Sequence, residues 1–339
     1  MRRLRRHAAW TRPAIAALVL LMSAGFPAEA YLKLGSNVGG GTISLRWSRM
    51  PIRYFVNEQG LPGISAVEYR SALDRAFATW QAVSSSTVAF QAAGVTSALP
   101  TDVDGMTTLG FQARPELDRV LGSTSFLVDT VTGEIVEAGI FFNSVFPWSV
   151  AAGGESGKYD VESIALHEIG HLAGLGHSAL GETELRPGGR RVLASESVMF
   201  PIAFSAGSTA GRQLRADDVA GISDIYPEPA FRASTGSVSG RVTRNGQGVF
   251  GAHVVAFNPA IGSLVGNFTL NDAGEFSIAG LEPGSYVVRV EPLDDADLTA
   301  FFGEGSNVQL NFGVTYLDRL AVVPAGGNAG PYEIKVTPR

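Results

Sequence analysis

Three histidines and a glutamate lie within eleven residues, and together they form the strongest chemical feature of the sequence. His167 and His171 are four residues apart, so on a helix they project from one face and can take two corners of a zinc tetrahedron. Glu168 is placed to act as a general base towards a metal-bound water. Gly174 can break the helix through a positive φ, which returns His177 as a third ligand. The pattern predicts a catalytic zinc site with an open fourth position.

The alternative is coincidence, because a bare His-Glu-x-x-His pair can arise on any amphipathic helix. Here, however, three of only five histidines in the chain belong to the cluster, and a glycine stands at the expected break. The other two, His7 and His253, fall in a basic leader and in a predicted strand. We therefore interpret the cluster as a metal site.

Three helices and several strands are predicted to position this cluster. The zinc helix should begin near Asp160 and run through Ala173. An earlier helix should begin after Ser65, because Glu68 three residues later completes a capping box, and it should turn one apolar face to a sheet. A third helix should be capped by Asp217 and carry its apolar residues inward. The predicted strands are Ile52–Val56, Val88–Gln91, Ser123–Val128 and Ile140–Asn143.

The region after residue 236 differs from the first region in its sequence pattern, which consists of short alternating strands and glycine-containing turns. Asn245-Gly246 and Pro283-Gly284 are typical turn pairs. The pattern predicts a small β-sandwich over residues 236–339, joined by a linker at 230–235 to a first domain at 31–229. The predicted strands are Val238–Thr243, His253–Phe257, Leu264–Leu270, Glu275–Ile278, Tyr286–Val290, Leu310–Leu317 and Tyr332–Val336.

Residues 1–30 predict a signal peptide and therefore a secreted protein, extracellular or periplasmic. A basic start precedes the apolar run Ala14–Met22, and Ala28-Glu29-Ala30 offers a cleavage site before Tyr31. A membrane anchor is the alternative, but the run is about half of the ~20 residues that a spanning helix needs. Cleavage would remove five arginines and one glutamate and move the net charge from −6 to −10. An acidic protein without basic clusters argues against nucleic acids and anionic membranes as partners.

The zinc cluster and its surroundings resemble the matrixin branch of the metzincin proteases. His167-Glu168-x-x-His171-x-x-Gly174-x-x-His177 matches the metzincin zinc signature, and Ser178 after it resembles the matrixin form. Ser197-Val198-Met199-Phe200-Pro201 resembles the matrixin Met-turn, with Met199 beneath the metal. The resemblance covers about Leu45 to Tyr226. It implies an α+β domain, with a twisted five-stranded sheet and three helices, and an extended peptide bound along the edge strand Ser123–Val128.

Several features depart from that family pattern. Histidines for a second, structural zinc are missing between the leader and the zinc helix, and the chain has no cysteine for a latency switch. Because no long segment separates residue 30 from the first domain, we expect activity without proteolytic maturation. Phe200 and Ala203 replace tyrosines found in some relatives. Structural calcium, common in the family, stays open, since Asp102, Asp104 and Asp129 are either oxygen ligands or ordinary surface acids.

The second region resembles the carboxypeptidase regulatory-like or transthyretin-like sandwich. The resemblance rests on Gly240-Arg241-Val242, Asp272-x-Gly274-x-Phe276 and Gly280-Leu281-x-Pro283-Gly284-x-Tyr286. The second region contains no second set of catalytic residues, so we expect this region to bind a large substrate, a cell surface or a second copy of the chain. A chain ending near Pro229 is then expected to cleave short peptides much as the full chain does.

The sequence therefore predicts a secreted zinc endopeptidase that acts on protein or peptide substrates. The alternative is a non-catalytic, zinc-stabilised surface-binding or adhesion protein that acts through the sandwich. The intact Glu168 argues against this alternative, because a purely structural zinc site has no need of a carboxylate there. The oligomeric state and the substrate have no signature in the sequence.

Overall fold

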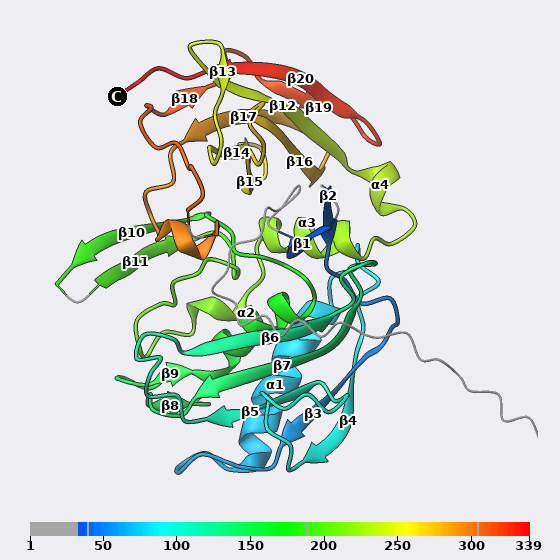
Figure 1. The fold of residues 1–339 in the computed structure, drawn as a ribbon, viewed down its shortest axis with the longest axis vertical. Helices are drawn as coiled ribbons and strands as arrows, with labels where there is room; N and C mark the ends of the chain where they lie inside the picture. Colours follow the sequence, from blue (N-terminus) through cyan, green and yellow to red (C-terminus); the bar gives the residue numbers. More distant parts are fainter. Residues whose placement is uncertain (1–32, 39–40, 188, 304) are drawn as a thin grey trace, which may run out of the picture.

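The computed structural model describes residues 33–38, 41–187, 189–303 and 305–339. A mixed α/β part is stacked against a β-rich part that follows it in the chain (Figure 1). This arrangement confirms the predicted fold class, α+β followed by a β-sandwich. The predicted signal peptide, residues 1–30, lies outside the described residues. Of the helices that are described, none combines the length and apolar character needed to span a bilayer.

A five-stranded sheet forms the centre of the α/β part. Its order is β4-β3-β5-β7-β6; the first three pairings are parallel, and β6 is antiparallel to β7 at the edge. The predicted strand Ser123–Val128 therefore is an edge strand. The strand Thr108–Gln112 was missed because nearly all of its residues are buried, so it lacks period-two alternation. The strands are β3 (Ile52–Asn57), β4 (Phe90–Thr96), β5 (Thr108–Gln112), β6 (Gly122–Val128) and β7 (Ile135–Asn143).

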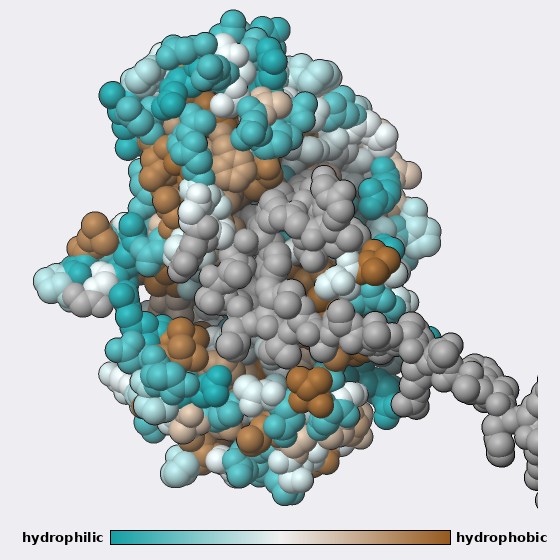
Figure 2. Space-filling model, in the orientation of Figure 1, coloured by the Kyte–Doolittle hydropathy of each residue, from teal (hydrophilic) through white to brown (hydrophobic). Residues whose placement is uncertain are grey.

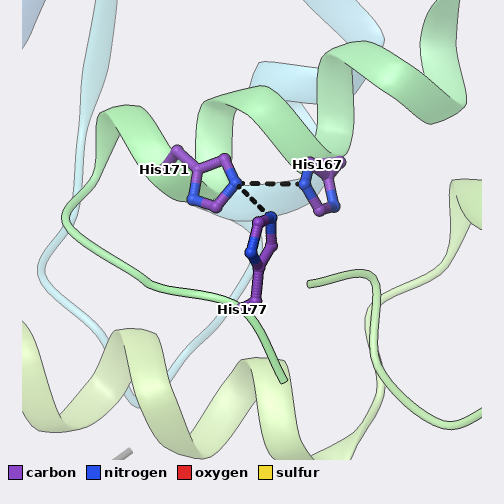
Figure 3. Close-up of side chains that lie close together, drawn as sticks. All are labelled: His167, His171 and His177. Atoms are coloured by element: carbon purple, nitrogen blue, oxygen red, sulfur yellow. Dashed lines mark hydrogen bonds between the residues drawn. The ribbon is translucent and has the colours of Figure 1, made fainter. Parts of the chain in front are cut away.

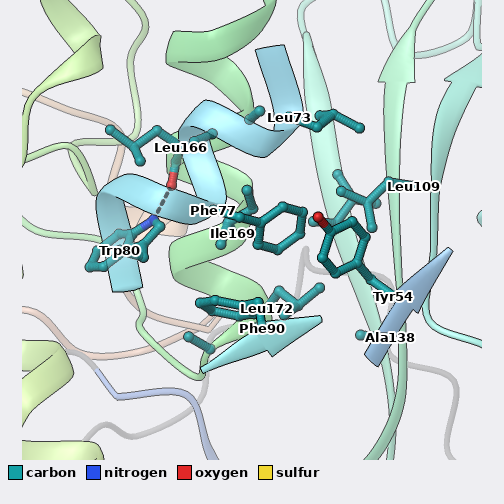
Figure 4. Packing of buried hydrophobic residues seen from close by; sticks show 14 of the residues in the cluster. Tyr54, Leu73, Phe77, Trp80, Phe90, Leu109, Ala138, Leu166, Ile169 and Leu172 are labelled. Carbon is teal, nitrogen blue, oxygen red and sulfur yellow. Dashed lines mark hydrogen bonds between the residues drawn. The ribbon is translucent and has the colours of Figure 1, made fainter. Parts of the chain in front are cut away.

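Two helices, α1 (Ala66–Gln81) and α2 (Val161–Leu172), pack together against this sheet. The predicted capping box starts α1: the Glu68 amide donates to the Ser65 hydroxyl at 3.2 Å, and the Ser65 amide donates to the Glu68 carboxylate at 3.0 Å. The buried indole N–H of Trp80 donates to the Leu166 carbonyl at 2.8 Å and ties the two helices together (Figure 4). The apolar face of α1 is thus fixed against the helix that carries the histidines.

The third helix, α3 (Ala216–Ile225), corrects one prediction. Asp217 was expected to cap it, but Arg215 occupies the N-cap position and Asp217 lies buried in the first turn. The neighbouring Asp218 supplies the capping interaction, because its carboxylate accepts the Arg215 amide at 2.8 Å. Asp217 instead faces the β-rich part, where it accepts the Gly266 amide at 2.9 Å.

The β-rich part is a sandwich of two sheets around its own apolar core. One sheet has the order β13-β12-β16 with β20 parallel to β12, and the other has the order β15-β14-β17-β18 with β19 also paired to β17. The strands are β12 (Gly236–Arg244), β13 (Gln247–Gly248), β14 (His253–Asn258), β15 (Ser263–Phe268), β16 (Glu275–Leu281), β17 (Gly284–Glu291), β18 (Thr315–Tyr316), β19 (Ala321–Val323) and β20 (Asn328–Lys335).

The predicted strand Leu310–Leu317 is wrong except for β18. The amides just before β18 donate to scattered carbonyls instead of one neighbouring strand: Gln309 to Phe250 at 3.0 Å and Gly313 to Thr337 at 3.0 Å. The apolar residues of this segment resemble those of a strand, but they belong to a loop. Phe312 is fully buried and anchors this loop in the sandwich core.

Shorter elements surround the two cores. The hairpin of β10 and β11 projects from the side of the molecule (Figure 1), and Figure 2 shows hydrophobic surface on its flank, where Leu185 and Leu193 are exposed. Within the predicted linker, residues 230–235, a short helix buries Phe231. The elements are β1 (Gly35–Val38), β2 (Gly41–Ser44), β8 (Trp148–Ser149), β9 (Tyr159–Asp160), β10 (Gly181–Arg186), β11 (Gly189–Ser195), α4 (Phe231–Ser234) and the 3₁₀ turns η1 (Ala210–Arg212) and η2 (Leu298–Ala300).

A third apolar cluster joins the two parts of the molecule. It combines Phe200 from the α/β part with Phe268, Phe301 and Phe302 from the sandwich. Next to it, Thr183 of the projecting hairpin donates its amide to the Asp295 carboxylate at 2.8 Å and its hydroxyl to the Asp295 carbonyl at 2.7 Å. The sandwich is therefore docked on the α/β part through apolar and polar contacts rather than hanging from a linker.

Candidate metal centre

Helix α2 presents the first two histidines because its start and its end are both fixed. Asp160 caps the start: its carboxylate accepts the Ser163 amide at 2.9 Å and pairs with the Arg212 guanidinium at 2.6 Å. At the other end Gly174 has a φ of +100°, as the sequence predicted, and a Cβ there would approach the Leu45 carbonyl oxygen to 2.6 Å. Only glycine fits this close turn, which redirects the chain towards His177.

The three histidines converge as predicted, with their ring nitrogens pointing at one another (Figure 3). The Nε2 atom of His171 lies 3.0 Å from Nε2 of His167 and 3.2 Å from Nε2 of His177. Tetrahedral zinc with bonds of about 2.0–2.1 Å separates its ligand nitrogens by about 3.3 Å. The observed spacing therefore fits such an ion, and among the described residues this is the one His, Cys, Asp and Glu group with metal-binding geometry.

The outer nitrogens of the same rings show which tautomer is present. Nδ1 of His167 lies 2.7 Å from the Val198 carbonyl, and Nδ1 of His171 lies 2.8 Å from the Leu175 carbonyl. Nδ1 of His177 lies 2.6 Å from the carbonyl of Ala300 in the sandwich. A carbonyl only accepts, so each Nδ1 carries the proton and each Nε2 lone pair faces the centre. Three converging lone pairs with no proton between them are a donor set for a cation.

Burial keeps these rings neutral. Desolvation, reinforced by the charge that a neighbouring ring would carry, lowers the pKa of His167 to about 3 and that of His171 well below its usual value. Burial likewise lowers the pKa of His177. Neutral imidazoles are the form that ligates zinc, so the site is ready for metal at neutral pH.

Glu168 lies beside the edge strand rather than among the ligand nitrogens. Its Oε2 accepts the Thr124 hydroxyl of β6 at 2.7 Å, and a Cβ on Gly122 would come within 3.0 Å of its Oε1. Burial raises the pKa of Glu168 to about 7, although the hydrogen bond from Thr124 acts in the opposite direction. Thr124 is a site residue that the sequence did not single out, because its relation to Glu168 depends on which face of β6 meets α2.

The turn around Met199 holds the carbonyl that orients His167. The Asp218 carboxylate accepts the Ser197 hydroxyl at 2.6 Å and the Val198 amide at 2.9 Å. This fixes the Val198 carbonyl that orients His167. Met199 is buried, and a Cβ on Gly170 of α2 would overlap its sulfur. The turn around Met199 therefore packs directly against α2, the helix that carries His167 and His171.

An open cleft of about 740 Å³ runs over the three histidines and Glu168. Strand β6 lines it through Gly122 and Thr124, and both Phe200 and Ala203 lie in its wall. Three kinds of segment thus meet at the cleft: an edge strand, the turn that follows Met199, and a piece of the sandwich. The sandwich contributes Ala296, Asp297 and Ala300.

The three acids left open as calcium ligands each cap their own loop. Asp102 accepts the Leu99 amide at 2.8 Å, Asp104 accepts the Met106 amide at 2.9 Å, and Asp129 accepts the Val131 amide at 2.8 Å. In the described part of the chain they are not brought together as a metal-binding group. These contacts are those of ordinary turn-forming acids.

Comparison with known proteins finds two family matches. The matrixin family model matches residues 46–227, and the carboxypeptidase regulatory-like domain model matches residues 237–313. The chain is 27% identical over 215 residues to metalloendoproteinase 1-MMP of Arabidopsis thaliana, a match that covers 59% of this chain and 50% of that protein. It is 28% identical over 199 residues to metalloendoproteinase 2-MMP of the same plant, covering 55% and 44%.

The matched region therefore spans about half the length of these curated relatives. Among solved structures, the Bacillus anthracis TIE protein is similar over 31% of this chain and 17% of that chain, at 17% identity and a TM-score of 0.19. That score is too low to support an argument from fold.

Proposed function

Because this chain belongs to the matrixin family, we propose that it is a zinc-dependent endopeptidase that hydrolyses peptide bonds with water. The observation that carries the proposal is the convergence of three neutral Nε2 atoms beside a buried carboxylate, in an open cleft. His167, His171 and His177 would hold the ion. Zinc bound there supplies a Lewis acid, which makes water a better nucleophile and polarises the substrate carbonyl.

The chain's own residues supply proton transfer. Glu168 takes a proton from the attacking water as the oxygen bonds to the carbonyl carbon, and returns it to the amide nitrogen as the C–N bond breaks. Thr124 holds the Glu168 carboxylate through its hydroxyl at 2.7 Å. Glu168 is almost fully buried but lines the cleft, so its carboxylate faces the space in which the substrate would lie.

Strand β6 supplies the means of binding an extended peptide. It is one of the two edge strands of its sheet, so it has unpaired backbone groups on its free side. A peptide can pair with it as an additional strand, which gives affinity without demanding a particular sequence. The residues that line the cleft next to it, including Ala203 and Phe204, then select side chains.

The proposed function includes export, which rests on residues 1–30 of the sequence. N-terminal sequencing of the protein released by a producing cell tests this part separately. A chain that begins at Tyr31 is the expected result, and a retained chain that begins at Met1 would contradict it.

Activity is tested with a fluorogenic peptide library on the metal-analysed full chain. We expect cleavage that a zinc chelator abolishes and added zinc restores, with one zinc per chain; the same metal analysis reports any calcium. Glu168→Gln should retain zinc and lose on the order of 10²–10⁴ in rate. A zinc-loaded wild-type chain that cleaves no library peptide would favour the non-catalytic alternative.

A further inference from the structure

The segment 294–303 of the sandwich reaches the metal centre of the other domain. It contains the 3₁₀ turn η2 (Leu298–Ala300), and the Ala300 carbonyl at its end lies 2.6 Å from Nδ1 of His177. We propose that the sandwich is an integral part of the metal centre, with Ala300 as the positioning residue that orients His177 for metal binding. This inference rests on the proposed zinc function of the three histidines, but not on proteolysis.

His177 needs such a partner more than the other two ligands do. His167 and His171 are carried by α2, whereas His177 follows the break at Gly174 and lies in a loop. A loop does not fix the direction of a ring. The carbonyl contact does so, since it keeps the proton on Nδ1 and aims the Nε2 lone pair at the centre.

The source of the carbonyl also distinguishes His177. The outer nitrogens of His167 and His171 meet the Val198 and Leu175 carbonyls, which belong to the same domain as the rings. For His177 the partner is 123 positions further along the chain and belongs to the sandwich. The Phe301 ring stands edge-on to the His177 ring, with a centroid distance of 6.2 Å, and packs beside it.

Segment 294–303 is anchored at both ends, so it can hold the side chain of His177 in one orientation. Within η2 the Ala300 amide donates to the Asp297 carbonyl at 2.9 Å. Just beyond η2, the rings of Phe301 and Phe302 are almost fully buried and pack on Phe268 of β15 at centroid distances of 5.4 and 5.2 Å. At its start, Asp295 is bound to the projecting hairpin as described above. The Ala300 carbonyl is therefore fixed between both domains.

A purely structural contact is the competing explanation, in which the segment only buries apolar surface between domains. The two explanations differ in what they predict for the metal. Loss of an outer-shell partner typically weakens metal binding or activity by about 10- to 100-fold. A structural contact would change the thermal stability of the folded chain but leave its zinc affinity and ligand geometry unaltered.

Variants of the full-length chain separate these explanations. Ala300→Pro removes the N–H that donates a hydrogen bond to the Asp297 carbonyl and displaces the Ala300 carbonyl, while Phe302→Ala loosens the segment without touching His177. Thr299→Ala is the matched control, because Thr299 lies on the same turn and is exposed to solvent. Phe302→Leu keeps an apolar anchor and should restore part of the loss.

The measurements are zinc dissociation constants by chelator competition, the visible absorption spectrum of the cobalt-substituted chain, and thermal unfolding. We expect Ala300→Pro and Phe302→Ala to weaken zinc binding about 10- to 100-fold and to change the cobalt spectrum, while Thr299→Ala matches the wild type. Folded variants that bind zinc and cobalt as the wild type does would overturn the proposal.

A measurement on the wild type covers the case in which these variants fail to fold. In the zinc-loaded chain, the Nδ1 proton of His177 should exchange slowly with solvent and appear downfield in the proton spectrum. Exchange of that proton at the solvent-limited rate would overturn the proposal without any variant. Because none of these readouts requires peptide cleavage, a chain that binds zinc in this way but cleaves nothing would refute only the proposed function.

Discussion

The hydrogen bond between Thr124 and Glu168 offers a sharp test of the proposed mechanism. Thr124→Val removes the hydroxyl and keeps the side-chain shape, so the 2.7 Å bond to Oε2 is lost while the packing of β6 on α2 is retained. A hydrogen bond to a charged group contributes about 1.5–3 kcal/mol. If the bond holds Glu168 in its reactive position, kcat/KM should fall by roughly 10- to 150-fold.

The assay compares kcat/KM on one fluorogenic peptide for zinc-saturated wild type, Thr124→Val and Thr124→Ser. Serine keeps the hydroxyl, so this variant should recover most of the lost rate, which a merely structural defect would not allow. Zinc content should be equal in all three proteins, because the hydroxyl of Thr124 donates its hydrogen bonds to Glu168 and not to a metal-binding histidine. A folded, zinc-loaded Thr124→Val within twofold of the wild type would refute the positioning role.

Three further predictions follow from close contacts and buried charge. Gly170→Ala should lower the melting temperature by several degrees, because its Cβ would overlap the Met199 sulfur, whereas Gly153→Ala, with open space around it, should not. Burial and a neighbouring carboxylate raise the pKa of Asp217 from its usual 3.8 to about 7. The folded chain therefore holds an extra proton between about pH 4 and 7, stability falls as pH rises through this window, and Asp217→Asn should remove that part of the slope in denaturant unfolding. A chain ending at Pro229 should bind zinc more weakly than the full chain in chelator competition; equal affinity would show that the sandwich is dispensable.

The predicted loss of zinc affinity in the chain ending at Pro229 differs from the expectation from the sequence, in which the sandwich leaves short-peptide cleavage unaffected. The sequence does not indicate that the sandwich contacts the metal centre, because the contact is made by a backbone group. A carbonyl oxygen is present in every residue, so Ala300 has no side chain that could mark it as part of a metal site. The strand patterns indicated a separate core correctly, but they contain no information on what that core docks against.

Other parts of the site were predictable because they follow local rules. The four-residue spacing of His167 and His171 fixes their common helix face, and Gly174 marks the break at the position where φ is +100°. The capping box at Ser65 likewise depends on neighbours in sequence. Thr124 was missed because its role depends on tertiary packing, in which one face of β6 meets α2. The projecting hairpin was missed because its mostly polar strands lack an alternating pattern.

The three outer-nitrogen contacts also imply that metal binding and domain docking are coupled. Leu175 belongs to the helix break, Val198 to the Met-turn and Ala300 to the sandwich, so the ligand set is complete only when all three segments are in place. If docking strengthens zinc binding by about 10- to 100-fold, then zinc must favour the docked arrangement by the same factor, because linkage between two binding equilibria is reciprocal. Zinc bound at the proposed site would therefore act on the structure as well as on the proposed reaction, because it would favour the arrangement in which the sandwich completes the wall of the cleft.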